Sequence, residues 1–184
     1  LPSVSAFAAA LGKTLDDDSA DPAFKSLMLE FPTEAEIAAL IGKEVNADHV
    51  REARRRIRAA IATELLPRLE TAFAATASTT AYTPDPASTG RRALRYAALS
   101  LIAAASPARG LALATAELAH PDNMTAEMGA LSSVLADVEA APLLQRFLER
   151  HGEDPLLVDK WLLLSAQAPL PGAPARVDAL TRHP

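Results

Sequence analysis

The chain of 184 residues has no cysteine, few aromatic residues and no long hydrophobic run, and each absence excludes a class of protein. Without cysteine there are no disulfides and no thiolate metal sites, which suits a cytoplasmic protein. No apolar run approaches the roughly 20 residues that a membrane span needs. The formal net charge of −5 argues against a nucleic-acid binder, which needs a basic face. We therefore expect a cytoplasmic protein whose partners include neither membrane nor nucleic acid.

Alanine supplies much of the apolar content, which amounts to 49% of the residues. Alanine favours helix and lets helices approach closely, but it buries little area per residue. A stable core must therefore come from stripes of larger apolar residues on many helices. Helix signals recur along the chain, whereas strand signals do not.

Capping signals predict the helices of the first 45 residues. Asp21 precedes Pro22, which pairs an N-cap with a proline at the first helical position. Thr33 and Glu36 have the spacing of a capping box for a short helix. A first apolar segment ends near Leu15, before a polar loop.

A long helix is predicted from about Asn46 to about Phe73. Its apolar residues recur every three or four positions and should bury one face. They are Val50, Ala53, Ile57, Ile61, Leu65, Leu69 and Phe73. Pro67 lies inside this helix, so we expect a kink or a break there. Residues 74–88 show no periodicity and form the longest predicted loop.

The second half predicts six helices with short links. They cover residues 88–105, 107–119, 123–138, 141–150, 155–167 and 174–182. Short links make consecutive helices antiparallel neighbours. We therefore predict an all-α fold in which residues 1–184 form one helical domain. Its architecture is an irregular helical solenoid, a superhelix of antiparallel helix pairs of the ARM/HEAT kind.

Histidine spacing argues against a zinc peptidase site within the chain. Such a site needs two histidines one helical turn apart with a glutamate base, in the order His-Glu-x-x-His. The four histidines, His49, His120, His151 and His183, are all farther apart than one turn. The acidic loop with Asp16, Asp17, Asp18 and Asp21 lacks the alternating ligands, glycine and terminal glutamate of an EF-hand. We interpret it as a solvated loop.

One basic face stands out in the long helix. Arg51, Arg54, Arg55 and Arg58 share a side of the helix, which would suit phosphate contact. Because the chain is acidic overall, we favour a solvated face whose arginines pair with Glu52, Asp48 or a neighbouring domain.

The predicted helix after Pro155 is apolar almost all round, which indicates burial, with Trp161 largely buried. Asp159 and Lys160 lie within it. If they are buried, each needs its own partner, because adjacent helical residues point about 100° apart. We expect them to join successive helices, and Asn123 to Thr125 are candidate neighbours of Asp159.

Two segments carry a family resemblance. Asn123-Met124-Thr125 and Val158-Asp159-Lys160-Trp161 resemble the C-terminal helical domain of bacterial aminopeptidase N, a zinc-dependent gluzincin family. Residues 21–34, 51–66 and 90–95 resemble it more generally. The chain departs from the family at Tyr96, Ala126-Glu127 and Leu162, which puts local pairings in doubt.

The resemblance implies a parent enzyme that removes N-terminal amino acids from peptides. The sequence begins at Leu1 without a methionine and stops after a helical pattern, and the resemblance implies that the family's domain continues past Pro184. We therefore expect the first part of the family's C-terminal domain, without the catalytic domain that holds the zinc. In the family this domain walls the substrate chamber and limits access to short peptides.

No catalytic, cofactor-binding or metal-binding residue is transferred to this chain. The resemblance makes the chain a non-catalytic fragment whose partners are the catalytic domain of the same parent chain and, in the parent, short peptides. The alternative is a free-standing helical-repeat scaffold that binds proteins or peptides. A His-Glu-x-x-His segment upstream of Leu1 would separate the two.

Overall fold

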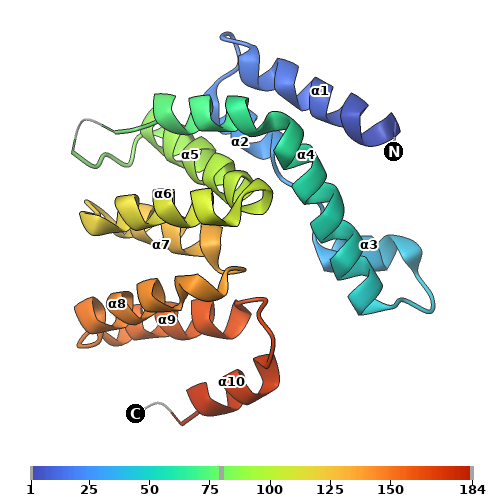
Figure 1. Cartoon of the computed structure of the whole chain (residues 1–184). Coiled ribbons are helices and arrows are strands. Elements are labelled where there is room, and N and C mark those ends of the chain that lie inside the picture. Colours follow the sequence, from blue (N-terminus) through green and yellow to red (C-terminus); the bar gives the residue numbers. More distant parts are fainter. Residues whose placement is uncertain (1, 79–80, 183–184) are drawn as a thin grey trace. The chain divides into compact units, whose positions relative to one another are not determined.

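The computed structural model describes residues 2–78 and 81–182, so Leu1, His183 and Pro184 lie outside the described part. Within it, all regular structure is helical (Figure 1). The elements are α1 (Pro2–Asp16), α2 (Pro22–Met28), α3 (Glu34–Ile41), α4 (Ala47–Ala75), α5 (Pro86–Ala105), α6 (Pro107–Ala119), α7 (Met124–Val134), the 3-10 turn η1 (Val138–Ala140), α8 (Ala141–His151), α9 (Pro155–Gln167) and α10 (Ala173–Leu180). None of these helices is both long and apolar enough to cross a membrane.

The chain divides into two compact units, Leu1–Ser106 and Pro107–Pro184. The first contains α1 to α5 and the second α6 to α10. That residues 1–184 form one domain stays a prediction.

In the first unit, α4 and α5 form the centre, with α1 and α3 against α4 and α2 against α5. The second half of the α4 stripe is buried as predicted, including Ile61, Leu65, Leu69 and Phe73. Pro67 lies inside α4, which continues as one bent helix rather than two (Figure 1). Arg95 of α5 donates to the carbonyl of Phe73 and lies over its ring, which closes the C-terminal end of α4.

The first half of α4 is less covered than its pattern predicts. Val50 is buried, but Ala53 is exposed and Ile57 keeps 42% of its surface exposed. The neighbouring α3 begins with the predicted capping box of Thr33 and Glu36 and has no buried residue. Local signals therefore place both helices, while part of their apolar surface remains open.

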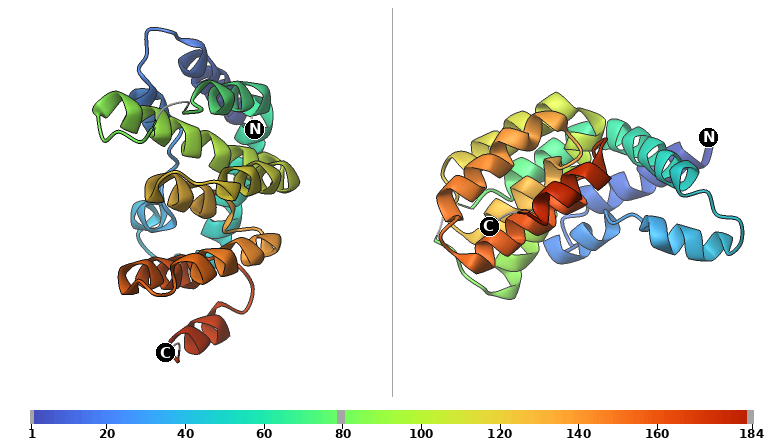
Figure 2. Two further views of the ribbon diagram at one scale, coloured as in Figure 1. Left: turned by 90° about the vertical axis from the view of Figure 1, so that its left-hand side faces the viewer. Right: turned by 90° about the horizontal axis from the view of Figure 1, so that it is seen from below.

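The second unit consists of neighbouring helices packed in sequence order. Contacts join α6 with α7, α8 with α9, and α9 with α10, and Figure 2 shows the first two pairs side by side. The core of the unit includes Leu131, Val134, Leu143, Phe147 and Leu164. This succession of short-linked pairs is the arrangement that the sequence predicts.

The predicted end of α7 is wrong. The helix ends at Val134 rather than Val138. Asp137 has extended backbone angles and accepts a hydrogen bond from the amide of Glu139, so it caps the next turn instead of continuing the helix. Aspartate favours such caps over helix interiors because its side chain competes for backbone amides.

The predicted burial of α9 on all sides is also wrong. Asp159 and Lys160 are exposed, whereas Trp161 keeps only intermediate exposure. Leu156 and Leu163 are 72% and 52% exposed, while Leu164 and Ser165 form the buried side of the helix. The apolar composition of a helix does not show which other helices pack against it. Here α8 and α10 cover one side only, so the expected joining role of Asp159 and Lys160 is not realised.

Candidate functional site

The histidines lie apart in the fold. His49 and His120 are exposed, whereas His151 places Nε2 2.9 Å from a carboxylate oxygen of Glu127. His183 lies outside the described residues. In the parts that the structure describes, no three histidine, cysteine or acidic side chains are grouped so that they could hold a metal ion. The donor set present therefore does not fit a zinc site, and the absence of bound zinc stays a prediction.

The carboxylates of the acidic loop turn to separate partners within the chain. Asp16 accepts from Nε of Arg68 at 2.8 Å, and Asp21 caps α2. Asp17 accepts from both the hydroxyl and the amide of Ser19, and these bonds lower the pKa of its carboxyl. Calcium ligands must converge on one point, and these side chains do not.

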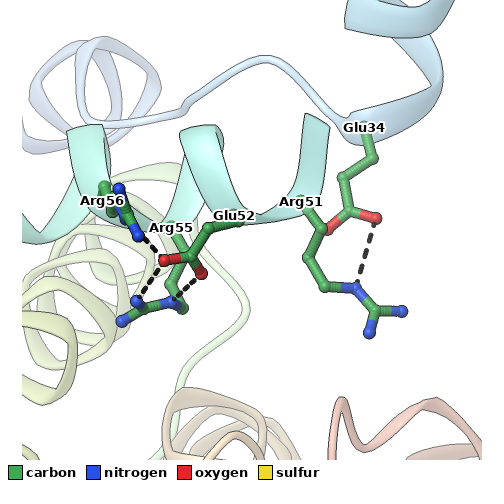
Figure 3. Close-up of polar contacts among 5 residues, drawn as sticks. All are labelled: Glu34, Arg51, Glu52, Arg55 and Arg56. Atoms are coloured by element: carbon green, nitrogen blue, oxygen red, sulfur yellow. Dashed lines mark hydrogen bonds and ion pairs between the residues drawn. The ribbon is translucent and has the colours of Figure 1, made fainter. Parts of the chain in front are cut away.

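The arginine face of α4 holds the first unit together. Nε of Arg51 lies 4.0 Å from Glu34, and Nε of Arg54 donates to the carbonyl oxygen of Pro32 at 2.6 Å (Figure 3 shows the first pair). Arg58 crosses to α5 and donates to the carbonyl and hydroxyl oxygens of Ser100 at 2.9 and 2.7 Å. Burial, and then the charge of Arg54, lower the pKa of the Arg58 guanidinium.

Glu52 binds two further arginines on the solvent side of the helix. Arg55 donates to it through two nitrogens at 2.8 Å, and Arg56 donates at 2.5 Å (Figure 3). These hydrogen bonds lower the pKa of the Glu52 carboxyl to about 2. The pairing with Glu52 agrees with the sequence interpretation. A face whose donors are engaged in this way offers few free groups to phosphates, and the exclusion of nucleic acid stays a prediction.

Glu127 forms a buried polar cluster that sequence reasoning missed. It lies in the first turn of α7, and only 5% of its side chain is exposed. Arg150 donates to one carboxylate oxygen at 2.6 Å, and Nε2 of His151 lies 2.9 Å from the other. The only sequence signals are an acidic residue at a helix start and basic residues at a helix end. The cluster joins α7 to α8, and both carboxylate oxygens of Glu127 have a partner on α8.

One pocket of the first unit lies between the end of α1 and helices α2, α4 and α5, and has a volume of about 560 Å³. Lys25, Arg68 and Arg91 line it together with Asp16 and Asp18. Lys25 donates to the carbonyl of Leu15, and Arg68 is paired with Asp16. The pocket could accept a small polar molecule, but it contains no nucleophile with an adjacent base.

A smaller apolar pocket of about 220 Å³ lies in the second unit, with Trp161 and Leu135 in its wall. Arg176 lines it but donates to the carbonyls of Ser165 and Ala168, which fixes α10 against the end of α9. The arrangement is a packing junction rather than a reaction centre, because its charged donor is already bound.

Comparison with known proteins gives matches over nearly the whole chain. Residues 2–184 match the family described as "Domain of unknown function (DUF3458_C) ARM repeats". Aminopeptidase N of Caulobacter vibrioides is 34% identical over 180 residues, which is 97% of this chain and 21% of that protein. Aminopeptidase N of Escherichia coli is 26% identical over 169 residues, which is 91% of this chain and 19% of that protein.

A crystal structure of Legionella pneumophila aminopeptidase A in complex with aspartic acid has the same fold. It superposes with a TM-score of 0.82 at 22% identity and covers 96% of this chain and 22% of that one. At this identity the likeness concerns the fold alone. The ARM-repeat description and the all-helical structure confirm the predicted solenoid class. The chain spans about a fifth of the length of the relatives that it matches.

Proposed function

The chain belongs to the ARM-repeat domain family DUF3458_C, and from this membership we propose that it is the non-catalytic helical domain of a bacterial zinc aminopeptidase. The observation that carries the proposal is the match to aminopeptidase N over 97% of this chain but only 21% of that protein. In this proposal the catalytic domain of the same polypeptide holds the zinc, and the described residues contribute no ligand. The absence of cysteine supports a cytoplasmic location.

The proposed role of the domain is to wall the substrate chamber and to limit access to short peptides. Two features support it. Hydrogen bonds of Arg58 join α4 to α5 in the first unit, and those of Glu127 join α7 to α8 in the second, which supports a structural role for both units. Large apolar side chains such as Leu40 and Leu156 remain 87% and 72% exposed, as expected for a domain that packs against others.

The first experiment compares the 184-residue chain with the complete gene product. We expect the complete protein to bind one zinc ion and to hydrolyse an aminoacyl anilide in a chelator-sensitive way. The 184-residue chain, dialysed and analysed for metal, should do neither, because its described residues offer no paired histidines. Stoichiometric zinc and turnover in the short chain would contradict the non-catalytic assignment. If the complete gene product neither bound zinc nor hydrolysed the anilide, that result would contradict the aminopeptidase activity proposed for the parent enzyme.

A second experiment tests the access role. In the complete enzyme, removal of residues 107–184 should raise kcat/KM for peptides longer than ten residues relative to kcat/KM for the small anilide. The anilide needs no wide entrance, so it reports whether the catalytic domain is still folded. An unchanged ratio with anilide activity retained would contradict the role. If anilide activity is lost, deleting only residues 141–184, which follow the η1 turn, repeats the comparison with a smaller deletion.

A further inference from the structure

Three of the five phenylalanines of this aromatic-poor chain belong to α1, to α2 and to the segment after α2, and α1 and α2 contact each other. Phe7 of α1 and Phe31, which follows α2, contact each other edge to face with ring centroids 6.4 Å apart. Phe24, Leu27 and Met28 share one side of α2. We call these five residues the phenylalanine patch.

The packing of α2 explains why the patch faces outward. Ser26 is buried, and Ala23, although itself exposed, lies against Gly90 of α5, so α2 meets α5 along this side. Phe24, Leu27 and Met28 point away from the buried Ser26 and are 46%, 61% and 40% exposed. Phe7 is 48% exposed. Large apolar side chains that share one side of a helix are costly to leave in water, and they suit an interaction surface.

The composition of the patch suits a protein partner. Aromatic residues and methionine are enriched at the centres of protein interfaces. The formal charge of −5 on each copy weakens association with a second copy, and the same charge opposes binding to an anionic membrane. In the relatives, about four fifths of the polypeptide lies outside the matched region and is linked to it covalently.

We infer that the phenylalanine patch is the face on which the remaining domains of the same polypeptide pack. This inference rests on the proposed function, and it names the surface through which this domain meets its enzyme. Leu27, the most exposed residue of the patch, becomes buried there, and Phe7 and Phe24 flank it as aromatic anchors.

Because the chain has no cysteine, single thiols can test the patch. Leu27→Cys is placed in the patch, and Ala60→Cys is the control at an exposed position of α4. Alkylation rates are measured at the level of single peptides by mass spectrometry, in the 184-residue chain and in the complete gene product. Both substitutions are at exposed positions, and circular dichroism confirms that each variant is folded.

We expect the thiol at position 27 to react about tenfold or more slowly in the complete protein than in the short chain, with position 60 unchanged. Equal rates at position 27 in the two proteins would overturn the inference, as would equal protection of both positions. Protection in the short chain that disappears on dilution would assign the patch to a second copy. The zinc and anilide assays on the same complete protein report separately on the proposed function.

Discussion

Glu127 is the one charged side chain that is buried in the described part of the chain. Its two partners remain partly exposed, with 41% of the Arg150 side chain and 20% of the His151 side chain accessible. They can turn to water if the carboxylate is removed, so the penalty should lie below that of a fully buried ion pair. The position of Glu127 in the first turn of α7 adds a favourable interaction with the helix dipole.

We therefore expect Glu127→Ala to lower the free energy of unfolding by roughly 2 to 3 kcal/mol, because it removes two hydrogen bonds to a charged group. Urea denaturation followed by circular dichroism measures the change. The matched control is Asp159→Ala, an exposed acidic residue of the same unit, which should leave the transition unchanged. An equal loss in both variants would show that Asp159 is also buried.

Glu52 gives a prediction about pH. Arg55 and Arg56 lower the pKa of its carboxyl to about 2, below the unfolded value of about 4.3. The ion pairs therefore favour the folded state at pH values above about 4.3, and this contribution disappears as the pH falls toward 2. The pairs are well exposed to solvent, so the effect on stability is small.

Carbon NMR of the Glu52 carboxyl should show a midpoint of about 2 in the parent chain. Replacing both arginines in the variant Arg55→Met, Arg56→Met should move the midpoint up toward the ordinary glutamate range. A parent midpoint near 4 would mean that the two hydrogen bonds do not persist in solution.

At the scale of elements, the crossing of α2 and α5 depends on Gly90, because glycine has no side chain to keep the two helices apart. A Cβ atom added at Gly90 would lie 3.0 Å from the backbone nitrogen of Ala23 and 3.2 Å from its Cβ. A backbone atom cannot move aside without displacing α2. At Gly12 of α1, by contrast, the added atom would meet only the flexible side chain of Arg68, at 3.4 Å.

The same substitution should therefore have opposite effects at the two glycines. Alanine favours helix over glycine by up to about 1 kcal/mol, so Gly12→Ala should raise the melting temperature slightly. Gly90→Ala should lower it, because the steric conflict with α2 outweighs that gain. Thermal melts of the two variants, side by side with the parent, provide the measurement. A stabilised Gly90→Ala variant would show that the helices are farther apart in solution.

Local signals predicted the elements well, whereas burial was harder to predict. The caps at Asp21 and Thr33 lie where the sequence places them, and α9 has its predicted bounds. A cap is formed by residues that lie close together in the chain, so the sequence shows which residues form it. The burial of Ile57 and Asp159 depends on which helices pack against them, and spacing alone does not contain that information. The bond between Glu127 and Arg150 joins residues of two different helices and is missed for the same reason.

For the whole molecule, the sequence predicted the repeat class and the family but not which large apolar side chains stay exposed. An all-round apolar helix such as α9 was interpreted as core, yet Leu156 and Leu163 are exposed in the second unit. In the first unit, α3 buries no residue, and Leu40 is 87% exposed. Such side chains are compatible with the matched length, because this chain spans only about a fifth of its relatives.

These exposed side chains predict how the 184-residue chain behaves alone. Apolar surface left in water favours association, so the chain should self-associate at high concentration, as measured by sedimentation velocity. Replacing Leu40 and Leu156 with glutamate should reduce that association without lowering the melting temperature, because neither side chain contributes to the core. Leu99→Ala, at a position with 0% exposure, is the contrasting control and should cost about 2 to 5 kcal/mol of stability. A large drop in melting temperature for the glutamate variant would show that Leu40 or Leu156 is packed in solution.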